Sequence, residues 1–255
     1  MIERDKIVVV ATHKEYRMPS DGMYLPVFVG SAAHGDRVTD GTGDNISAKN
    51  YCYCELTALY WAWKNTKSEV LGLAHYRRHF AGGGKGDKFD RILTADRLDG
   101  YLRKCEVLLP KKRHYFIESN ESQYLHAHHE EGLRAAESVI REYYPDHAAA
   151  WTAVMKKRSG HRFNMFIMTR RYADAYCEWL FDVLAKTEEK LDIGGWQPSE
   201  QRVFGYLGER LLDVWLAANG IRYKDIPYMF MEKQHWPTKI KNFLKRKFAG
   251  KGGGK

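Results

Sequence analysis

The sequence has few cysteines and no long hydrophobic run. A membrane-spanning helix needs about 20 consecutive apolar residues, and no segment reaches that length. The four cysteines follow neither a disulfide framework nor a zinc-site spacing, so we expect reduced side chains of the kind found in the cytosol. The first apolar run, at residues 7–11, is too short and its flank too acidic for a signal peptide. Together these absences favour a cytoplasmic protein.

Acidic residues are also missing from the end of the chain. Residues 233–255 contain seven lysines and Arg246 but no aspartate or glutamate. Subtracting these eight charges from the net charge of +9 leaves +1 for residues 1–232. A near-neutral body does not present the broad basic face that nucleic acids require, so we expect no nucleic-acid partner. The sequence predicts one domain at 1–232, followed by a basic tail at 233–255.

Short apolar runs alternate with helical patterns along residues 1–232, which is typical of an α/β fold with a mostly parallel sheet. We expect strands at 7–11, 25–29, 70–80, 105–109 and 162–168. Helices are expected at 47–65, 96–104, 121–142, 146–157, 172–190 and 201–219. Ser47 is the expected cap of the first helix. Gly220 is expected to end the last one, because glycine is favoured just after a helix.

Polar side chains follow two of the expected strands. The strand at 70–80 turns from apolar to polar at residues 75–79, His-Tyr-Arg-Arg-His, and Thr12-His13-Lys14 follows the first strand. Ligands of open α/β sheets bind beyond the carboxyl ends of the strands, so these residues predict an anion site. Adjacent strand residues point to opposite faces, so only one of Arg77 and Arg78 is expected to meet the ligand. The alternatives are a solvated strand end and an ordinary solvated turn.

Two polar residues stand within apolar patterns. Glu55 borders the apolar stripe of the helix at 47–65, and no basic residue lies three or four positions away to pair with it. It is either solvated at the helix edge or orients His75 or Arg77. Asn164 is the only polar residue in the middle of the strand expected at 162–168.

The helix at 201–219 carries Glu209 on the side away from its apolar stripe. Gly205 and Gly208 on this helix allow a ligand or another backbone to approach closely. Glu209 is therefore either a reactive carboxylate or a solvated one on the outer face of the helix.

Three histidines, His126, His128 and His129, precede Glu130. Their spacing cannot place three ligands on one face of a helix, so we do not expect a zinc site. The cluster contains either a substrate-facing histidine or ordinary surface residues.

Six segments resemble the motifs of a known family and occur in its order. They are Thr12–Lys14, Gly43–Ser47, Cys54–Asn65, Gly72–Arg78, Asn164–Met168 and Arg202–Leu212. Together they resemble a bacterial family of capsular and exopolysaccharide glycosyltransferases, long catalogued as a domain of unknown function, whose members are associated with β-galactofuranosyl transfer. The resemblance covers residues 6–232. It implies a single GT-A-like domain that binds a nucleotide sugar over the carboxyl ends of its strands.

The resemblance implies transfer of a sugar, expected to be galactofuranose, from a uridine diphosphate donor to a hydroxyl of a lipid-linked polysaccharide precursor. The alternatives are a transferase for another nucleotide-hexose, a binding module without catalysis and, against the charge distribution, a basic nucleic-acid-binding protein. Typical GT-A enzymes hold a divalent metal with an Asp-x-Asp motif, and this chain contains none. Arginines at the equivalent place can neutralise a diphosphate instead. We therefore expect inverting, metal-independent transfer without a cofactor, although Asp44 or Glu55 could still hold a metal.

The expected roles follow from the resemblance and the strand-end position. Arg77 and Arg78 are assigned to the leaving diphosphate, and Glu209 is the first choice for the general base, with Asp44 or Glu200 as substitutes. The assigned donor-binding residues are Thr12, His13, Lys14, Asp44, Asn45, His75 and Tyr76. The assigned substrate-binding residues are Asn164, His128 and Arg202.

The basic tail has a narrow apolar side. Residues 239–248 interleave five basic with four apolar residues, and on a helix Ile240, Phe243, Leu244 and Phe248 share one side. We expect it to hold the protein on the anionic inner face of the cytoplasmic membrane, near a lipid-linked acceptor. The alternative is a solvated basic tail whose last residues are an added sequence.

Overall fold

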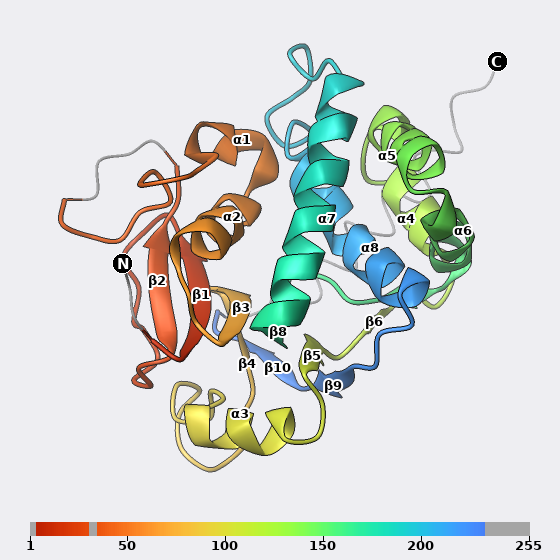
Figure 1. The fold of residues 1–255 in the computed structure, drawn as a ribbon. Coiled ribbons are helices and arrows are strands. Elements are labelled where there is room, and N and C mark those ends of the chain that lie inside the picture. Colours follow the sequence, from red (N-terminus) through yellow and green to blue (C-terminus); the bar gives the residue numbers. More distant parts are fainter. Residues whose placement is uncertain (1–3, 31–34, 233–255) are drawn as a thin grey trace.

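The computed structural model describes residues 4–30 and 35–232. The basic tail expected at 233–255 lies outside these residues. Figure 1 shows the described chain as a central sheet flanked by helices. Within it, no helix is long and apolar enough to cross a membrane.

An eight-stranded sheet forms the centre of the fold. Its order is β2-β1-β3-β8-β5-β9, and the short strands β4 and β10 continue from the end of β3. The strands are β1 (Lys6–Thr12), β2 (Tyr24–Phe28), β3 (Val70–His75), β4 (Arg78–Phe80), β5 (Val107–Pro110), β8 (Phe166–Thr169), β9 (Lys224–Ile226) and β10 (Tyr228–Phe230). Outside this sheet, β6 (Arg113–His114) pairs with β7 (Ser159–Gly160).

The position of β1 explains its uniformly apolar sequence. β1 pairs in parallel with β2 on one side and β3 on the other, and residues 7–10 are completely buried. A strand covered on both faces is apolar throughout rather than at alternate positions. β5 and β9 are also parallel, while β8, β4 and β10 join antiparallel. The mostly parallel α/β sheet expected from the sequence is confirmed.

Helices cover the sheet in two layers. They are α1 (Asn50–Tyr53), α2 (Leu56–Asn65), α3 (Ala95–Leu102), α4 (Asn120–Leu125), α5 (Glu130–Tyr143), α6 (Ala148–Lys156), α7 (Arg170–Glu189) and α8 (Val203–Ala218). α7 lies between α2 and α8, and these three share one apolar core with the sheet. Leu98 of α3 belongs to a second apolar cluster on the other face. As expected, α8 ends before Gly220, which has a φ of 59°.

The single helix expected at 47–65 is wrong. A short 3₁₀ turn, Ser47–Lys49, leads into α1, and the chain breaks at Cys54, with φ 54° and ψ −132°, before α2 begins. Ser47 does not cap this helix, because its hydroxyl donates to Asp40 Oδ1 at 2.6 Å. The break leaves Glu55 at the first turn of α2.

Three other expected elements also differ from the structure: one strand is shorter than expected, and a strand and a helix are each divided in two. The strand at 70–80 ends at His75, and the two-residue turn Tyr76–Arg77 leads into β4. The strand at 162–168 begins only at Phe166, because Phe163 and Asn164 have positive φ values of 75° and 54°. The helix at 121–142 is α4 and α5, separated by a turn at 126–129 that contains the histidine cluster.

Candidate functional site

The carboxyl ends of β1 and β3 bring two expected donor-binding segments together. Their parallel pairing ends at Ala11 beside His75, so His13 and Lys14 lie next to Tyr76. The Tyr76 hydroxyl is 3.4 Å from His13 Nε2, and Lys14 Nζ is 5.0 Å from the centre of the Tyr76 ring. The sequence correctly predicted that these residues follow the carboxyl ends of strands, and the two strands are neighbours.

Thr12 shapes the turn that follows β1. Its hydroxyl donates to the carbonyl of Lys14 at 2.6 Å and accepts from the Lys14 N–H at 3.3 Å, and the residue is buried. Lys14 also lies 3.6 Å from Glu232. The Thr12 hydroxyl is therefore used to position the backbone of Lys14.

His75 is neutral in this environment. Burial, together with the charges of Arg77 and Arg78, lowers its pKa to about 3. The backbone N–H of Arg77 donates to His75 Nδ1 at 3.2 Å, so the ring carries its proton on Nε2. His75 can thus act as a hydrogen-bond donor without carrying positive charge.

Arg77 and Arg78 are partly buried and lack acidic partners. The Nε atom of each is buried without a hydrogen-bond partner. In the described part of the chain, neither guanidinium forms an ion pair with a carboxylate within 4 Å. The expectation that strand alternation separates them is wrong, because Arg77 lies in the turn and only Arg78 belongs to β4. Strand alternation therefore does not decide which of the two meets a ligand.

Aromatic rings hold the two guanidinium groups in place. The guanidinium carbon of Arg78 is 4.2 Å from the centre of the Phe163 ring and 5.5 Å from that of Phe230. That of Arg77 is 5.2 Å from the centre of the Tyr76 ring. Burial lowers the pKa of Arg78, whereas the carboxylates of Glu55 and Glu209 raise it. Arg78 therefore interacts electrostatically with both carboxylates.

Glu55 is held by Asn164. Its Oε1 accepts from Asn164 Nδ2 at 3.0 Å, and the same amide nitrogen donates to the carbonyl of Gly205 at 3.1 Å. Burial raises the pKa of Glu55. In the described structure the hydrogen-bond partner of Glu55 is therefore Asn164, not His75 or Arg77 as the functional alternative expected. Asn164 is itself buried, and its Oδ1 has no partner in the described structure.

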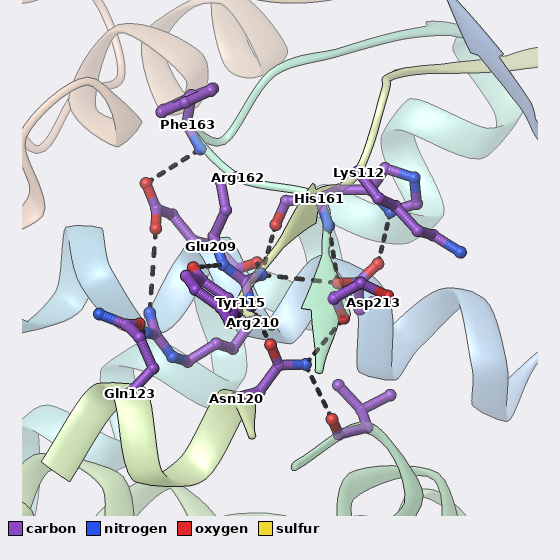
Figure 2. Close-up of polar contacts among 12 residues, drawn as sticks. Lys112, Tyr115, Asn120, Gln123, His161, Arg162, Phe163, Glu209, Arg210 and Asp213 are labelled. Atoms are coloured by element: carbon purple, nitrogen blue, oxygen red, sulfur yellow. Dashed lines mark hydrogen bonds and ion pairs between the residues drawn. The ribbon is translucent and has the colours of Figure 1, made fainter. Parts of the chain in front are cut away.

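Glu209 lies against the turn before β8 (Figure 2). Its Oε1 accepts from the backbone N–H of Phe163 at 2.9 Å, and its Oε2 is 3.8 Å from Arg210 Nη1. Its backbone carbonyl accepts from Arg162 Nη1 at 3.1 Å. The alternative of a solvated carboxylate on an outer helix face is wrong, because this face of α8 packs on residues 161–164.

The glycines of α8 permit close packing rather than space for a sugar. A Cβ on Gly205 would lie 3.0 Å from Cys54 Sγ. A Cβ on Gly208 would lie 2.8 Å from Asn164 Oδ1 and 2.9 Å from Leu56 Cδ1. The sequence suggested that these glycines allow either a ligand or another part of the protein to approach closely. In the structure, neighbouring protein atoms lie against them. The glycines bring α8 against the residues that hold Glu55.

Arg202 and His128 form a row with Tyr206. Arg202 stands at the start of α8, its Nε donates to Cys54 Sγ at 3.1 Å, and its guanidinium carbon is 5.7 Å from the centre of the Tyr206 ring. His128 stacks on Tyr206 with ring centres 3.9 Å apart. The charge of Arg202 also contributes to lowering the pKa of His13. Arg202 and His128 thus lie on either side of Tyr206, and Arg202 acts electrostatically on the strand-end residue His13.

Two expected donor-binding residues lie elsewhere. Asp44 accepts from the Tyr60 hydroxyl at 3.1 Å, and its N–H donates to Asn65 Oδ1 at 3.1 Å. Asn65 ends α2, ten residues or about 15 Å along the helix from Glu55. Asn45 stays in the same loop, where its amide donates to Gly43. The structure does not bring this loop to the strand-end cluster.

A cavity of about 510 Å³ lies beside this loop, between residues 37–42 and the end of α2. Its lining includes Trp61, Lys64 and Lys67 but no residue of the strand-end cluster. His79, counted in the polar run of the sequence, is also outside the site. It is completely buried and hydrogen-bonds through Nε2 to the Tyr16 hydroxyl.

The strand-end residues do not fit a divalent cation. In the described ranges, no three His, Cys, Asp or Glu side chains are grouped to hold a metal. The two carboxylates closest to the arginines already accept hydrogen bonds, Glu55 from Asn164 and Glu209 from Phe163. Asp44, the other metal ligand considered, lies at the far end of α2.

Sequence reasoning missed two aromatic residues of the site. Phe163 supports Arg78, and Tyr206 separates His128 from Arg202. Tyr206 could have been found, because it lies four residues after Arg202 on the same helical face. Phe163 gives no such signal, because its role depends on a positive φ that cannot be predicted from the sequence.

Comparisons with known proteins agree with this architecture. Residues 6–220 match the family model described as "Domain of unknown function (DUF4422)". The chain is also similar to the apo structure of the bifunctional glycosyltransferase WbbM, with 26% identity and a TM-score of 0.81. That similarity covers 90% of this chain and 46% of WbbM, so the chain spans less than half of that protein. No curated protein matches the chain.

The two matches confirm the family resemblance and the GT-A-like α/β fold expected from the sequence. The family model extends over most of the sequence, from the first residue of β1 to just past the end of α8. The chain belongs to the DUF4422 family.

Proposed function

We propose that this protein is a glycosyltransferase whose donor diphosphate binds at the carboxyl ends of β1 and β3. One observation carries the proposal: Arg77 and Arg78 are adjacent and partly buried, and in the described chain neither guanidinium forms an ion pair with a carboxylate within 4 Å. Burying a cation without a counter-charge is costly, so such a pair is best explained by an anion that binds there. The similarity to a bifunctional glycosyltransferase supports a nucleotide diphosphate as that anion.

The arginines stabilise the leaving group in this proposal. When the bond between the sugar C1 and the diphosphate oxygen breaks, negative charge develops on the diphosphate. Guanidinium groups donate charge-assisted, bidentate hydrogen bonds to such oxygens in a fixed geometry. The proton on His75 Nε2 adds a neutral donor beside them. This arrangement supports metal-independent transfer.

Glu209 is the proposed general base for an inverting reaction. The acceptor hydroxyl attacks C1 while the carboxylate takes its proton. Its Oε1 is fixed by the Phe163 N–H, and its Oε2, 3.8 Å from Arg210 Nη1, is the proposed proton acceptor. Glu55 is the competing residue, but burial raises its pKa and so favours its protonated form.

The sugar and the acceptor are proposed from the family resemblance. The donor is UDP-galactofuranose, with another nucleotide-hexose as the alternative, and the acceptor is a hydroxyl of a lipid-linked polysaccharide precursor. Arg202 and His128 lie in a row that leads away from the arginines, which suits an extended sugar substrate. The basic tail at 233–255 would hold the enzyme on the inner face of the cytoplasmic membrane.

A donor panel tests the activity. Purified full-length protein is incubated with UDP-, GDP- and dTDP-sugars in the presence of a chelator, and release of the nucleoside diphosphate is followed with and without a glycan acceptor. We expect one UDP-sugar to be consumed, faster with acceptor than without. Absence of turnover with every donor, even when manganese is added, would leave a binding module as the better description.

A further inference from the structure

Two large apolar side chains protrude next to each other from the folded body. Phe116 is 86% exposed and Ile117 is 64% exposed. Both follow β6 in the loop that leads to α4, and Phe116 has a φ of 25°. Large apolar side chains are rarely this exposed side by side on a surface that meets only water.

Basic residues surround this apolar pair. The pairing of β6 with β7 brings residues 111–114 beside residues 158–160, and the N–H of Tyr115 donates to the carbonyl of Arg158 at 2.8 Å. The exposed cations on residues 111–114 and on residues 156–160, which include the end of α6, are Lys111, Arg113, Lys156, Lys157 and Arg158. In the described chain, none of these five forms an ion pair with a carboxylate.

Acidic side chains are absent from the same two segments. Residues 110–117 and 156–160 contain no aspartate or glutamate. The next carboxylate along the chain, Glu118, is buried and hydrogen-bonds to His126 Nδ1 at 2.7 Å. Residues 111–117 and 156–158 therefore make one basic surface with an apolar tip, which we call the basic-apolar surface.

We propose that the basic-apolar surface docks on an anionic lipid bilayer, with Phe116 and Ile117 inserted between the lipids. Cations attract anionic headgroups, and a protruding apolar pair enters the boundary of the acyl chains. A protein partner would need an interface of about 1,000 Å² with an apolar centre, which two residues at a loop tip do not supply. Nucleic acid would use the cations, but Ile117 cannot stack on a base.

The basic-apolar surface is joined to the candidate site by a short chain of contacts (Figure 2). Tyr115, the residue before Phe116, accepts a hydrogen bond through its hydroxyl from Arg162 Nε at 2.7 Å. Arg162 precedes Phe163, whose ring supports Arg78 and whose N–H is bonded to Glu209. Resting on the proposed function, this inference places the glycan of a membrane-anchored acceptor beside the residues that would transfer the sugar.

Vesicle flotation with the full-length chain tests the proposal. The variants are the apolar double change Phe116→Ser with Ile117→Ser and the charge double change Lys156→Gln with Lys157→Gln. Tyr143→Ser is the matched control, because Tyr143 is 49% exposed on a different helix. We expect each double variant to bind phosphatidylglycerol-containing vesicles about tenfold more weakly or worse, since burial of apolar groups and nearby cations each contribute to membrane binding. The control should bind like the parent, and phosphatidylcholine vesicles should bind little.

Two further arms separate this surface from the tail and from catalysis. Both double changes are also made in a full-length chain whose tail carries Lys245→Gln, Arg246→Gln and Lys247→Gln. In this background the apolar double change should again weaken vesicle binding about tenfold. Donor hydrolysis in solution should be unchanged in the apolar variant, so loss of membrane binding is distinguishable from loss of activity. Vesicle binding that depends on the tail changes alone would overturn the proposal. A dimer that dissociates in the apolar variant, seen by sedimentation, would assign the surface to a second copy of the chain and would equally overturn it.

Discussion

The guanidinium of Arg78 lies 4.2 Å above the ring of Phe163, and the backbone N–H of Phe163 donates to Glu209 at 2.9 Å. One residue with a φ of 75° therefore positions both the proposed leaving-group cation and the proposed base. The three residues come from β4, the turn before β8, and α8. The site thus depends on how α8 packs against that turn.

Replacement of either arginine should slow transfer strongly. Arg77→Ala and Arg78→Ala each remove a charge-assisted donor from a partly buried site, so we expect transfer to fall by about 10²- to 10³-fold. Lysine should restore only part of the rate, because it lacks the bidentate geometry. Arg103→Ala, at the exposed end of α3, is the control. The rate of diphosphate release from donor and acceptor gives the comparison, and unchanged rates in both variants would remove the arginines from the mechanism.

Two glutamine substitutions distinguish the candidate bases. Glu209→Gln keeps an oxygen that can accept from the Phe163 N–H, so we expect the fold and donor binding to persist while transfer falls by about 10²-fold or more. Glu55→Gln should have the smaller effect on transfer. Both are measured as transfer rate and donor affinity on the same preparations. A large loss in Glu55→Gln combined with normal transfer in Glu209→Gln would reverse the assignment.

His161 should make stability depend on pH. It is buried, and its two ring nitrogens lie within hydrogen-bond distance of Asp213 and Asp225, the latter at 2.9 Å. Burial lowers the pKa of His161, but the hydrogen bonds to both aspartates outweigh it and raise the pKa above its usual value. A raised folded-state pKa stabilises the protein fully below the unfolded value of about 6.5, and this contribution is lost as pH rises through the folded-state pKa.

Urea unfolding measures this contribution. We expect the wild-type free energy of unfolding to decrease from pH 6 towards pH 9, and His161→Gln to lower it by about 2 kcal/mol at pH 6, because Asp213 and Asp225 lose their charged hydrogen-bond donor. His114→Gln, at an exposed position, is the control. Equal pH profiles for wild type and His161→Gln would show that the imidazole is not charged in the folded state.

The close approach of α8 gives a packing prediction. Gly208→Ala would place a methyl group 2.8 Å from Asn164 Oδ1 and 2.9 Å from Leu56 Cδ1. Overpacking of this kind costs about 1–3 kcal/mol and should displace Asn164 from Glu55. Gly195→Ala, which meets no atom within 4 Å, is the control. Thermal unfolding of both variants checks the cost, and equal midpoints would mean that the neighbours of Gly208 move aside without penalty.

The sequence predicted the parts of the site that depend on local patterns. The apolar run at 7–11 marks a strand covered on both faces, and the polar residues after it and after His75 mark the carboxyl ends of two parallel strands. α8 was also predictable, because its apolar stripe and Gly220 define both its buried face and its end. These elements placed His13, His75 and the two arginines together.

Tertiary contacts decide the features that the sequence did not predict. The sequence does not predict a turn at Tyr76–Arg77, because neither residue is a usual turn former. The residues after this turn also have a pattern typical of a strand. Phe163 has a positive φ, and its N–H is bound by Glu209, 46 residues later in the chain. Asp44 belongs to a motif of the family, but its contacts with Tyr60 and Asn65 hold it at the other end of α2.

Titration of UDP by calorimetry tests the central claim most directly. In a chelator-containing buffer, we expect the wild-type full-length protein to bind UDP, and Arg77→Ala and Arg78→Ala each to bind it about 10- to 100-fold more weakly, because each loses a hydrogen bond between charged groups. Arg103→Ala should bind like the wild type. Equal UDP affinity in the wild type and both site variants would contradict an anion site at this turn, and binding that appears only after manganese is added would contradict metal-independent recognition of the diphosphate.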